Sequence, residues 1–103
     1  MLPLLPRLKL ANADGVETIL QFKSSTTTFG RGAECDYVFA ENQGLSRVHC
    51  IFTAEPSRVL VRDNNSTNGT YVNGNRVTEA ALRDGDVIQI GSLEMTFMAG
   101  RVQ

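Results

Sequence analysis

Turn-forming residues punctuate this chain at short and regular intervals. Glycine, asparagine and aspartate tolerate a positive φ or bond to their own backbone, so clusters of them mark turns. Such clusters stand at 12–15, 30–32, 41–44, 64–65, 73–74, 84–85 and 91–92, and Glu55-Pro56-Ser57 is a further turn signal. Spacings of about 8 to 12 residues between turns are typical of an all-β sandwich or barrel. The stretch 78–83 is the remaining candidate for a helical turn.

The segments between the turns carry the period-two pattern of strands. Leu93, Met95 and Phe97, for example, share one face, and β-branched or aromatic residues are frequent throughout. Strands are predicted at 18–22, 24–29, 37–39, 48–53, 59–62, 87–90 and 93–98. The pair Asn73-Gly74 predicts a two-residue hairpin loop of type I′. Two sheets packed face to face, an all-β sandwich, are therefore the expected architecture.

Length and charge exclude several classes of function. The chain has 103 residues, which predicts a single domain over 1–103. Its net charge is -1, from 10 Lys+Arg and 11 Asp+Glu, which argues against direct binding of nucleic acid or an anionic membrane. No apolar run approaches the roughly 20 residues needed to span a bilayer. The first residues lack the pattern of a signal peptide.

The small number of cysteines and histidines argues against a disulfide scaffold, a metal site and histidine-dependent catalysis. Cys35 and Cys50 are too few for a disulfide scaffold, so an intracellular, reducing setting is expected. His49 is the single histidine, which removes most two-histidine metal sites and any histidine-relay enzyme. We therefore expect no catalytic residues, no metal and no cofactor.

Three stretches at strand edges carry more information than β patterning needs. They are residues 28–31, 44–49 and 65–74. Together they supply the guanidinium groups of Arg31 and Arg47, the hydroxyls of Ser46 and Thr67, and the amide of Asn68. Arginine forks and hydroxyl donors suit a dianionic phosphate, because its oxygens accept charge-assisted bonds. A side-chain amide pairs well with a peptide backbone. This inventory points to a phosphate carried on a polypeptide.

The joint pattern resembles the forkhead-associated (FHA) domain over a motif core of about 28–91. The ordered blocks are Phe29-Gly30-Arg31, Cys35-Asp36-Tyr37-Val38, Leu45-Ser46-Arg47-Val48-His49, the run 63–74 and the run 82–91. The resemblance implies a two-sheet β-sandwich of about eleven mostly antiparallel strands. It also implies a module that recognises phosphothreonine in partner proteins and mediates phosphorylation-dependent protein–protein interaction. The domain is expected to be a monomer.

The resemblance also assigns ligand contacts by position. It implies phosphate binding by Arg31 and Ser46. Arg47 stands at the following position, which faces the phosphate or the peptide in the family. Thr67 matches a loop residue that helps to bind phosphate. Asn68 matches the asparagine that bonds the ligand backbone.

A second group is expected to support the site rather than touch the ligand. His49 matches a structural histidine that braces the binding loops. Gly30, Gly69 and Gly74 would supply backbone geometry, and Asn73 belongs to the same block as Gly74.

Three alternatives remain open at this point. One is a hydrolase with Ser46 as nucleophile and His49 as base, although no Gly-x-Ser-x-Gly elbow is present. Another is a zinc site formed by Cys35, His49 and Cys50, although no Cys-x-x-Cys pair exists. The last is an FHA-like scaffold that binds partners independently of phosphate, because a fold does not dictate its site.

Overall fold

The computed structural model describes residues 6–11 and 15–100, and within them the chain forms eleven strands. The strands are β1 (Arg7–Ala11), β2 (Glu17–Gln21), β3 (Thr26–Gly30), β4 (Tyr37–Val38), β5 (Cys50–Ala54), β6 (Val59–Asp63), β7 (Thr70–Val72), β8 (Asn75–Val77), β9 (Glu79–Ala81), β10 (Val87–Ile90) and β11 (Leu93–Met98). These residues contain no helix that is long and apolar enough to cross a membrane.

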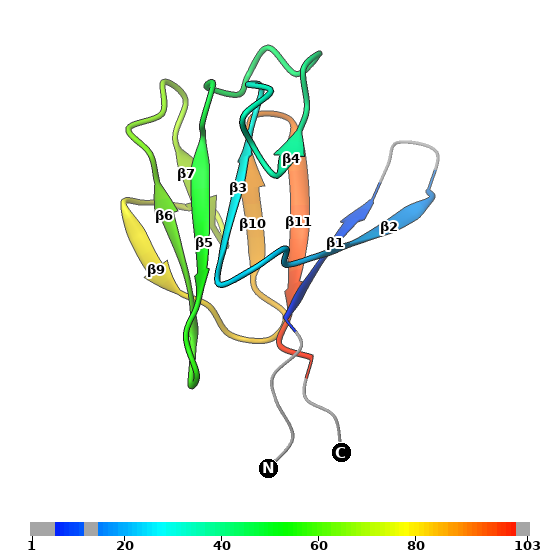
Figure 1. The fold of residues 1–103 in the computed structure, drawn as a ribbon, viewed down its shortest axis with the longest axis vertical. Helices are drawn as coiled ribbons and strands as arrows, with labels where there is room; N and C mark the ends of the chain where they lie inside the picture. The colour runs from blue at the N-terminus through cyan, green and yellow to red at the C-terminus, as the bar shows by residue number, and fades with distance from the viewer. Residues whose placement is uncertain (1–5, 12–14, 101–103) are drawn as a thin grey trace.

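The strands form two sheets, as Figure 1 shows. One has six strands in the order β2-β1-β11-β10-β7-β8, and the other has five in the order β4-β3-β5-β6-β9. Every neighbouring pair is antiparallel except β3 and β4, which are parallel. The prediction of a two-sheet, mostly antiparallel sandwich is therefore confirmed.

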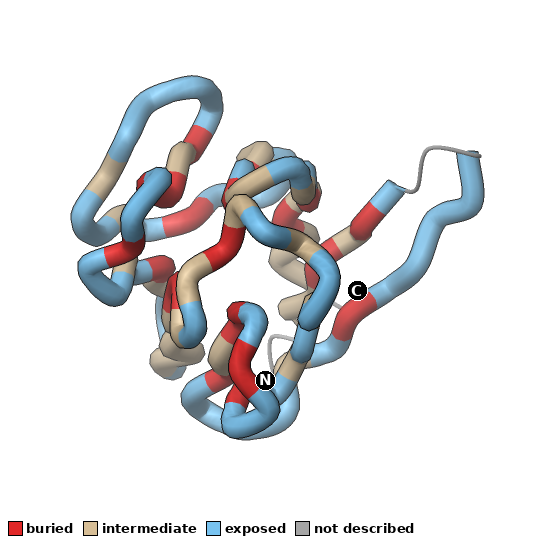
Figure 2. Tube along the Cα trace, turned by 90° about the horizontal axis from the view of Figure 1, so that it is seen from above, coloured by how far each residue is buried: buried red, intermediate tan, exposed pale blue. Residues whose placement is uncertain are grey.

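The hydrophobic core lies between the sheets and follows the period-two pattern of the strands. Phe29 and Phe52 are fully buried and pack edge to face, with ring centroids 5.2 Å apart. From the other sheet, Ile88, Ile90 and Met95 are also fully buried. Figure 2 shows buried and exposed residues alternating along the chain. Burying such side chains stabilises the fold by roughly 1.5–3 kcal/mol each.

The hairpin predicted at Asn73-Gly74 is confirmed. It joins β7 to β8, with Val72 opposite Asn75 in the register. Asn73 has a φ of 51° and Gly74 a φ of 84°, and a type I′ turn needs a positive φ at both central residues.

Two expectations about local structure were wrong. The candidate helical turn at 78–83 instead contains β9, whose Ala81 lies opposite Leu60 of β6. Pairing with β6 outweighs the weak local preference of this short segment. The strand predicted to start at Val48 starts at Cys50, because the preceding residues form a turn. The strand β1 was not predicted.

Three connections meet at the upper end of the sandwich in Figure 1. They join β3 to β4, β4 to β5 and β6 to β7. Each of the three stretches that the sequence singled out lies in one of these connections or runs into it from a strand, apart from the hairpin. Loops carried on a rigid sandwich are common places for binding sites. The fold therefore gathers the predicted ligand-binding residues at one end.

Candidate functional site

Backbone hydrogen bonds hold the β3–β4 loop against the β4–β5 loop. The N–H of Arg31 donates to the carbonyl of Ser46 at 3.1 Å, and the N–H of Gly32 donates to the carbonyl of Arg47 at 2.9 Å. The two loops thus continue the pairing of the sheet beyond the end of β3. This places Arg31 beside Ser46, although they are far apart in the sequence.

Gly30 makes that close approach feasible. A Cβ atom on Gly30 would collide with the backbone carbonyl of Arg47 and lie 2.9 Å from the carbonyl oxygen of Ser46. Both obstacles are backbone atoms, so neither can rotate away. Glycine is therefore needed here for space rather than for a left-handed backbone.

The Ser46 side chain links its loop to the β6–β7 loop. The Ser46 Oγ accepts a hydrogen bond from the backbone N–H of Thr67 at 2.9 Å. A hydroxyl has one hydrogen and two lone pairs, so the Ser46 O–H remains able to donate. Thr67 is exposed beside it.

The Asn68 amide makes a second link between the same loops. Its Nδ2 donates to the carbonyl of Gly44 at 3.0 Å. Asn68 is exposed, and its amide keeps one further N–H and its carbonyl oxygen for other partners. This side chain therefore braces the loops and still offers a donor and an acceptor at the surface.

The two predicted phosphate-binding arginines differ in their surroundings. The Arg31 Nε donates to the carbonyl of Leu45 at 2.7 Å, and no acidic partner of Arg31 is recorded among the described residues. Arg47 instead forms an ion pair with Glu34, with its Nε 2.9 Å from Glu34 Oε2. A hydrogen bond from its own backbone N–H lowers the pKa of Glu34, and Arg47 lowers it further. Arg31 therefore offers the less compensated positive charge.

His49 lies fully buried under the loops and contacts both of them. Its Nδ1 accepts a hydrogen bond from the backbone N–H of Ser46 at 3.1 Å. Because Nδ1 is the acceptor, Nε2 carries the hydrogen and donates to the carbonyl of Gly69 at 2.8 Å. The imidazole thus bridges the β4–β5 loop and the β6–β7 loop.

This geometry argues against the hydrolase and zinc alternatives. Both ring nitrogens of His49 are bonded to backbone groups, so neither faces the Ser46 hydroxyl as a base or is free for a metal. Burial raises the pKa of the Cys50 thiol, which opposes the thiolate that zinc requires. In residues 6–11 and 15–100, no group of three potential metal ligands gathers.

The sequence analysis missed a carboxylate that organises the β6–β7 loop. Asp63 accepts hydrogen bonds from the Ser66 hydroxyl at 2.5 Å, the Ser66 N–H at 3.0 Å and the Thr70 hydroxyl at 2.7 Å. The Ser66 Oγ in turn accepts the N–H of Gly69 at 2.9 Å. Partial burial raises the pKa of Asp63, but these hydrogen bonds outweigh it and hold the pKa below its usual range. The local spacing Asp-x-x-Ser was the signal available in the sequence.

Two of the predicted supporting residues lie away from these loops. The Asn73 Oδ1 accepts the N–H of Val87 at 3.0 Å, and its Nδ2 donates to Asp86 at 3.0 Å. Asn73 and Gly74 therefore fix the β7–β8 hairpin against the start of β10. Gly69 does lie in the β6–β7 loop, with a φ of 93°.

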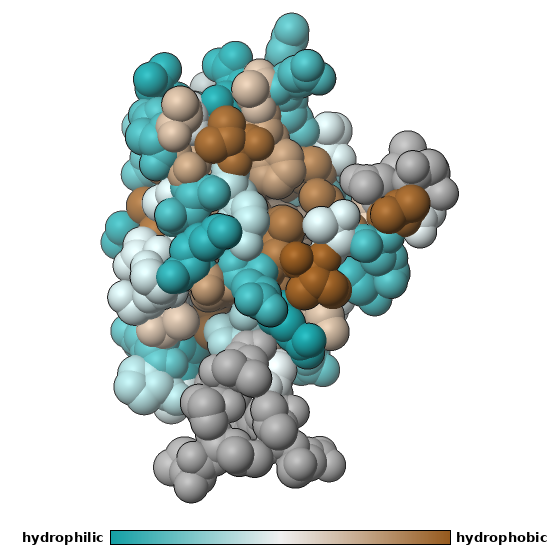
Figure 3. Space-filling view, turned by 45° about the vertical axis from the view of Figure 1, so that its right-hand side comes forward, coloured by the Kyte–Doolittle hydropathy of each residue, from teal (hydrophilic) through white to brown (hydrophobic). Residues whose placement is uncertain are grey.

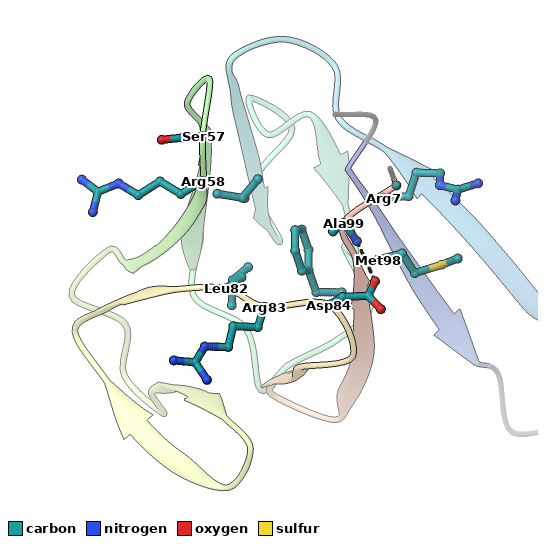
Figure 4. A pocket seen from close by; sticks show the side chains of 11 residues that line it. Arg7, Ser57, Arg58, Leu82, Arg83, Asp84, Met98 and Ala99 are labelled. Atoms are coloured by element: carbon teal, nitrogen blue, oxygen red, sulfur yellow. Dashed lines mark hydrogen bonds between the residues drawn. The ribbon is translucent and has the colours of Figure 1, made fainter. Parts of the chain in front are cut away.

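A hollow of about 580 Å³ lies at the other end of the sandwich, and none of the predicted site residues lines it (Figure 4). Its apolar lining includes the buried side chains of Val59, Leu82 and Phe97. Arg58 on its rim is already paired with Glu55 at 2.6 Å, and Figure 4 shows Arg58 and Arg7 extending away from each other. The polar lining of the hollow includes Arg7, Arg58 and Arg83, and the hollow lies apart from the loops that hold the predicted site residues.

The molecular surface shows apolar residues dispersed among polar ones. On the face in Figure 3, hydrophobic patches are separated by hydrophilic residues. In residues 6–11 and 15–100, the exposed large apolar side chains are Val16, Ile19 and Val38. Scattered exposure of this kind is ordinary on a protein surface.

An all-β sandwich with a polar, loop-borne surface defines a binding module of the forkhead-associated type. The FHA domain family model matches residues 27–91, and this chain belongs to the FHA domain family. FHA domains are non-enzymatic binding modules, which agrees with the bonding of His49 to the backbone.

The curated relatives include two mycobacterial proteins. The chain is 44% identical over 71 residues to the ABC transporter ATP-binding/permease protein Rv1747 of Mycobacterium tuberculosis, covering 69% of this chain and 8% of that protein. It is 40% identical over 75 residues to the glycogen accumulation regulator GarA of Mycolicibacterium smegmatis, covering 73% of this chain and 47% of GarA. The chain thus matches about half or less of the length of these relatives.

Solved structures extend the likeness over nearly the whole chain. A structure from an analysis of phosphothreonine-dependent FHA domain interactions has a TM-score of 0.83 and 32% identity, covering 95% of this chain and 99% of that one. The FhaA FHA domain, solved in complex with the intracellular domain of Rv3910, has a TM-score of 0.78 and 34% identity, covering 89% of this chain and 98% of that one. The likeness therefore includes strands outside residues 27–91.

Proposed function

We propose that this domain binds phosphothreonine in partner proteins and thereby mediates phosphorylation-dependent protein–protein interaction. The observation that carries the proposal is the junction at Ser46. Its carbonyl accepts the backbone N–H of Arg31 and its hydroxyl accepts the backbone N–H of Thr67, so these three residues lie side by side. Arg31 and Thr67 are exposed there, and Ser46 is partly exposed. The solved FHA structure described as phosphothreonine-dependent supports the same ligand.

The charges and donors fit this ligand. A phosphothreonine brings about -1.5 to -2 charges and three strong acceptor oxygens. In the proposal, Arg31 and Ser46 bind the phosphate, with Arg47 and Thr67 beside them. Asn68 pairs with the main chain of the peptide through the amide groups that Gly44 leaves free. Such a site needs no general basic patch, which suits a protein of net charge -1.

The proposal extends to the organisation of the chain. The chain is proposed to act as a single domain, because β1, β2 and β11 complete the same six-stranded sheet as strands of the motif core. The proposed domain is a monomer. The unpaired thiols of Cys35 and Cys50 suit an intracellular, reducing compartment. The domain has no catalytic role of its own and acts by binding a phosphorylated partner.

Calorimetry with a phosphothreonine peptide and its unphosphorylated twin tests the proposal. The phosphorylated peptide is expected to bind with micromolar affinity, about -8 kcal/mol at 1 μM. Arg31→Ala is expected to cost about 2 kcal/mol or more of that binding, because it deletes a charge-assisted fork. Arg83→Ala removes an exposed arginine at the other end and serves as the matched control. Equal affinity for both peptides would support the phosphate-independent scaffold instead.

A further inference from the structure

Arg76 of β8 lies directly against the β6–β7 loop. A Cβ atom on Gly69 would be 2.6 Å from Arg76 Nε and 3.0 Å from its Cζ, so the guanidinium occupies the space that a side chain at position 69 would fill. Arg76 is exposed, and among the described residues neither a hydrogen bond nor an ion pair of its side chain is recorded. A positive charge without an ion-pair partner among the described residues therefore lies next to Gly69 in the β6–β7 loop.

Glu34 lies beside the site on the β3–β4 loop. A Cβ atom on Gly32 would collide with the Glu34 carboxylate and lie 2.8 Å from Arg47 Cγ, so the pair folds over the bare backbone of Gly32. The Glu34 side chain is 48% exposed, and the pair is joined at 2.9 Å. The carboxylate is therefore held in place and still faces solvent.

These two charges lie on opposite sides of the proposed phosphate position. Glu34 lies in the loop that precedes β4, which is one edge of the five-stranded sheet. Arg76 lies on β8, an edge of the six-stranded sheet, and β8 leads through Thr78 into β9, the other edge of the five-stranded sheet. Contacts run from Glu34 through Arg47 and Ser46 to the β6–β7 loop and then to Arg76.

We propose that this surface selects phosphothreonine peptides by charge on both sides of the phosphate, with a basic residue towards Glu34 and an acidic residue towards Arg76. The inference rests on the proposed phosphothreonine binding and adds the chemistry of the flanking residues. When the phosphate binds Arg47, it competes with Glu34 for the guanidinium. The Glu34 carboxylate then becomes available to a lysine or arginine of the ligand. Arg76 has no ion-pair partner among the described residues, so a ligand carboxylate can bind to it without displacing another carboxylate.

The effect of each flanking charge is modest because both groups are exposed. Exposed ion pairs change binding by about two- to fivefold each, corresponding to a few tenths of a kcal/mol up to about 1 kcal/mol. Salt screens such pairs, so the preference weakens as ionic strength rises. The existence of a preference between the two charged orders is therefore more informative than its size.

The test compares three phosphothreonine peptides by calorimetry at low salt. One has neutral flanks, one has lysines before and glutamates after the phosphothreonine, and one has the reverse order. One charged order is expected to bind about two- to fivefold more tightly than the neutral peptide, and the other more weakly. The unphosphorylated neutral peptide is titrated in parallel. Binding that does not depend on phosphate overturns the proposed function, whereas phosphate-dependent binding with equal affinity for both charged orders overturns this inference alone.

Substitutions assign the preference to the two residues. Glu34→Gln and Arg76→Gln are each expected to reduce the ratio between the two charged orders, and the double variant to abolish it. Glu55→Gln removes the acid of another exposed glutamate–arginine pair, and Arg83→Gln removes another exposed arginine, both at the far end of the sandwich. These matched controls are expected to leave the ratio unchanged. A ratio that survives in the double variant overturns the assignment, and melting temperatures show that the variants remain folded.

Discussion

The Ser46 hydroxyl accepts the backbone N–H of Thr67 at 2.9 Å and so joins two loops across 21 positions of sequence. The hydroxyl hydrogen is left to donate in another direction. In the proposed complex that hydrogen points to a phosphate oxygen. One atom would then both assemble the site and contact the ligand, so structure and binding are coupled at this position.

The first prediction concerns this coupling. Ser46→Ala removes the acceptor for Thr67 and the proposed donor to the phosphate, so phosphopeptide affinity is expected to fall strongly. The free energy of unfolding is expected to fall by about 1 kcal/mol, the usual net value of one hydrogen bond. Calorimetry and urea denaturation measure the two effects.

Two variants complete the test of Ser46. Ser46→Thr keeps a hydroxyl and is expected to retain more binding than the alanine variant. Ser57→Ala removes an exposed serine at the far end and is expected to change neither quantity. Unchanged affinity in Ser46→Ala would remove this residue from the ligand contacts.

The second prediction separates support from ligand contact at His49. His49→Ala leaves the Ser46 N–H and the Gly69 carbonyl without their partner beneath the loops. Each buried group left unpaired costs about 1–3 kcal/mol, so a large drop in the denaturation midpoint is expected. Phosphopeptide binding should weaken as a consequence of the loosened loops.

The control for His49 is Gln89→Ala, which removes an exposed side chain in the middle of β10. It is expected to leave the free energy of unfolding within about 0.5 kcal/mol of that of the unchanged protein. A His49→Ala variant that keeps both its midpoint and its affinity would contradict the bracing role.

Sequence patterns predicted this fold where the determinants are local. The hairpin at Asn73-Gly74 follows from two residues that accept a positive φ, and the structure confirms it. The segment 79–81 was mistaken for a helical turn because its strand state depends on pairing with β6. Local composition contains no information about that partner.

In the candidate site too, local features could be predicted from the sequence and features that depend on strand pairing could not. Arg31, Ser46, Thr67 and Asn68 were found as motif positions and meet at one end of the sandwich. The contact between Gly69 and Arg76 could not be predicted, because Arg76 reaches the loop only once β8 has paired with β7. The interactions of Asp63 with Ser66 and Thr70 were within reach of sequence reasoning, since they are short-range.

The third prediction is a pH dependence that arises from Asp63. Its pKa in the folded protein is held below the unfolded value, which is close to 4. A lowered pKa contributes stability above the unfolded value, and this contribution is lost as the pH falls through the folded pKa. The free energy of unfolding should therefore decrease on acidification from about pH 5 towards pH 2.

Asp63→Asn isolates that contribution. The variant is expected to be less stable than the unchanged protein at neutral pH, and the difference is expected to shrink as the pH falls. Asp84→Asn is the control, because Asp84 is exposed at the other end and accepts a single backbone N–H. Denaturation curves across the acid range measure the difference, and a constant gap at all pH values would exclude a titrating role for Asp63.

The last prediction concerns Asn68, whose amide donates to the carbonyl of Gly44 and has groups left for a peptide. Asn68→Ala is expected to weaken all phosphothreonine peptides by a similar factor, because bonds to a ligand backbone do not distinguish its side chains. The expected cost is about 1–3 kcal/mol, the range for leaving a donor or acceptor unpaired. Asn68→Asp keeps an acceptor oxygen but loses the donor to Gly44 and adds a negative charge near the phosphate, so it should bind more weakly still. Titration of several peptides that differ only in their flanking residues measures this. A uniform loss supports a main-chain contact, whereas a changed order of preference among the peptides would show that Asn68 contacts ligand side chains.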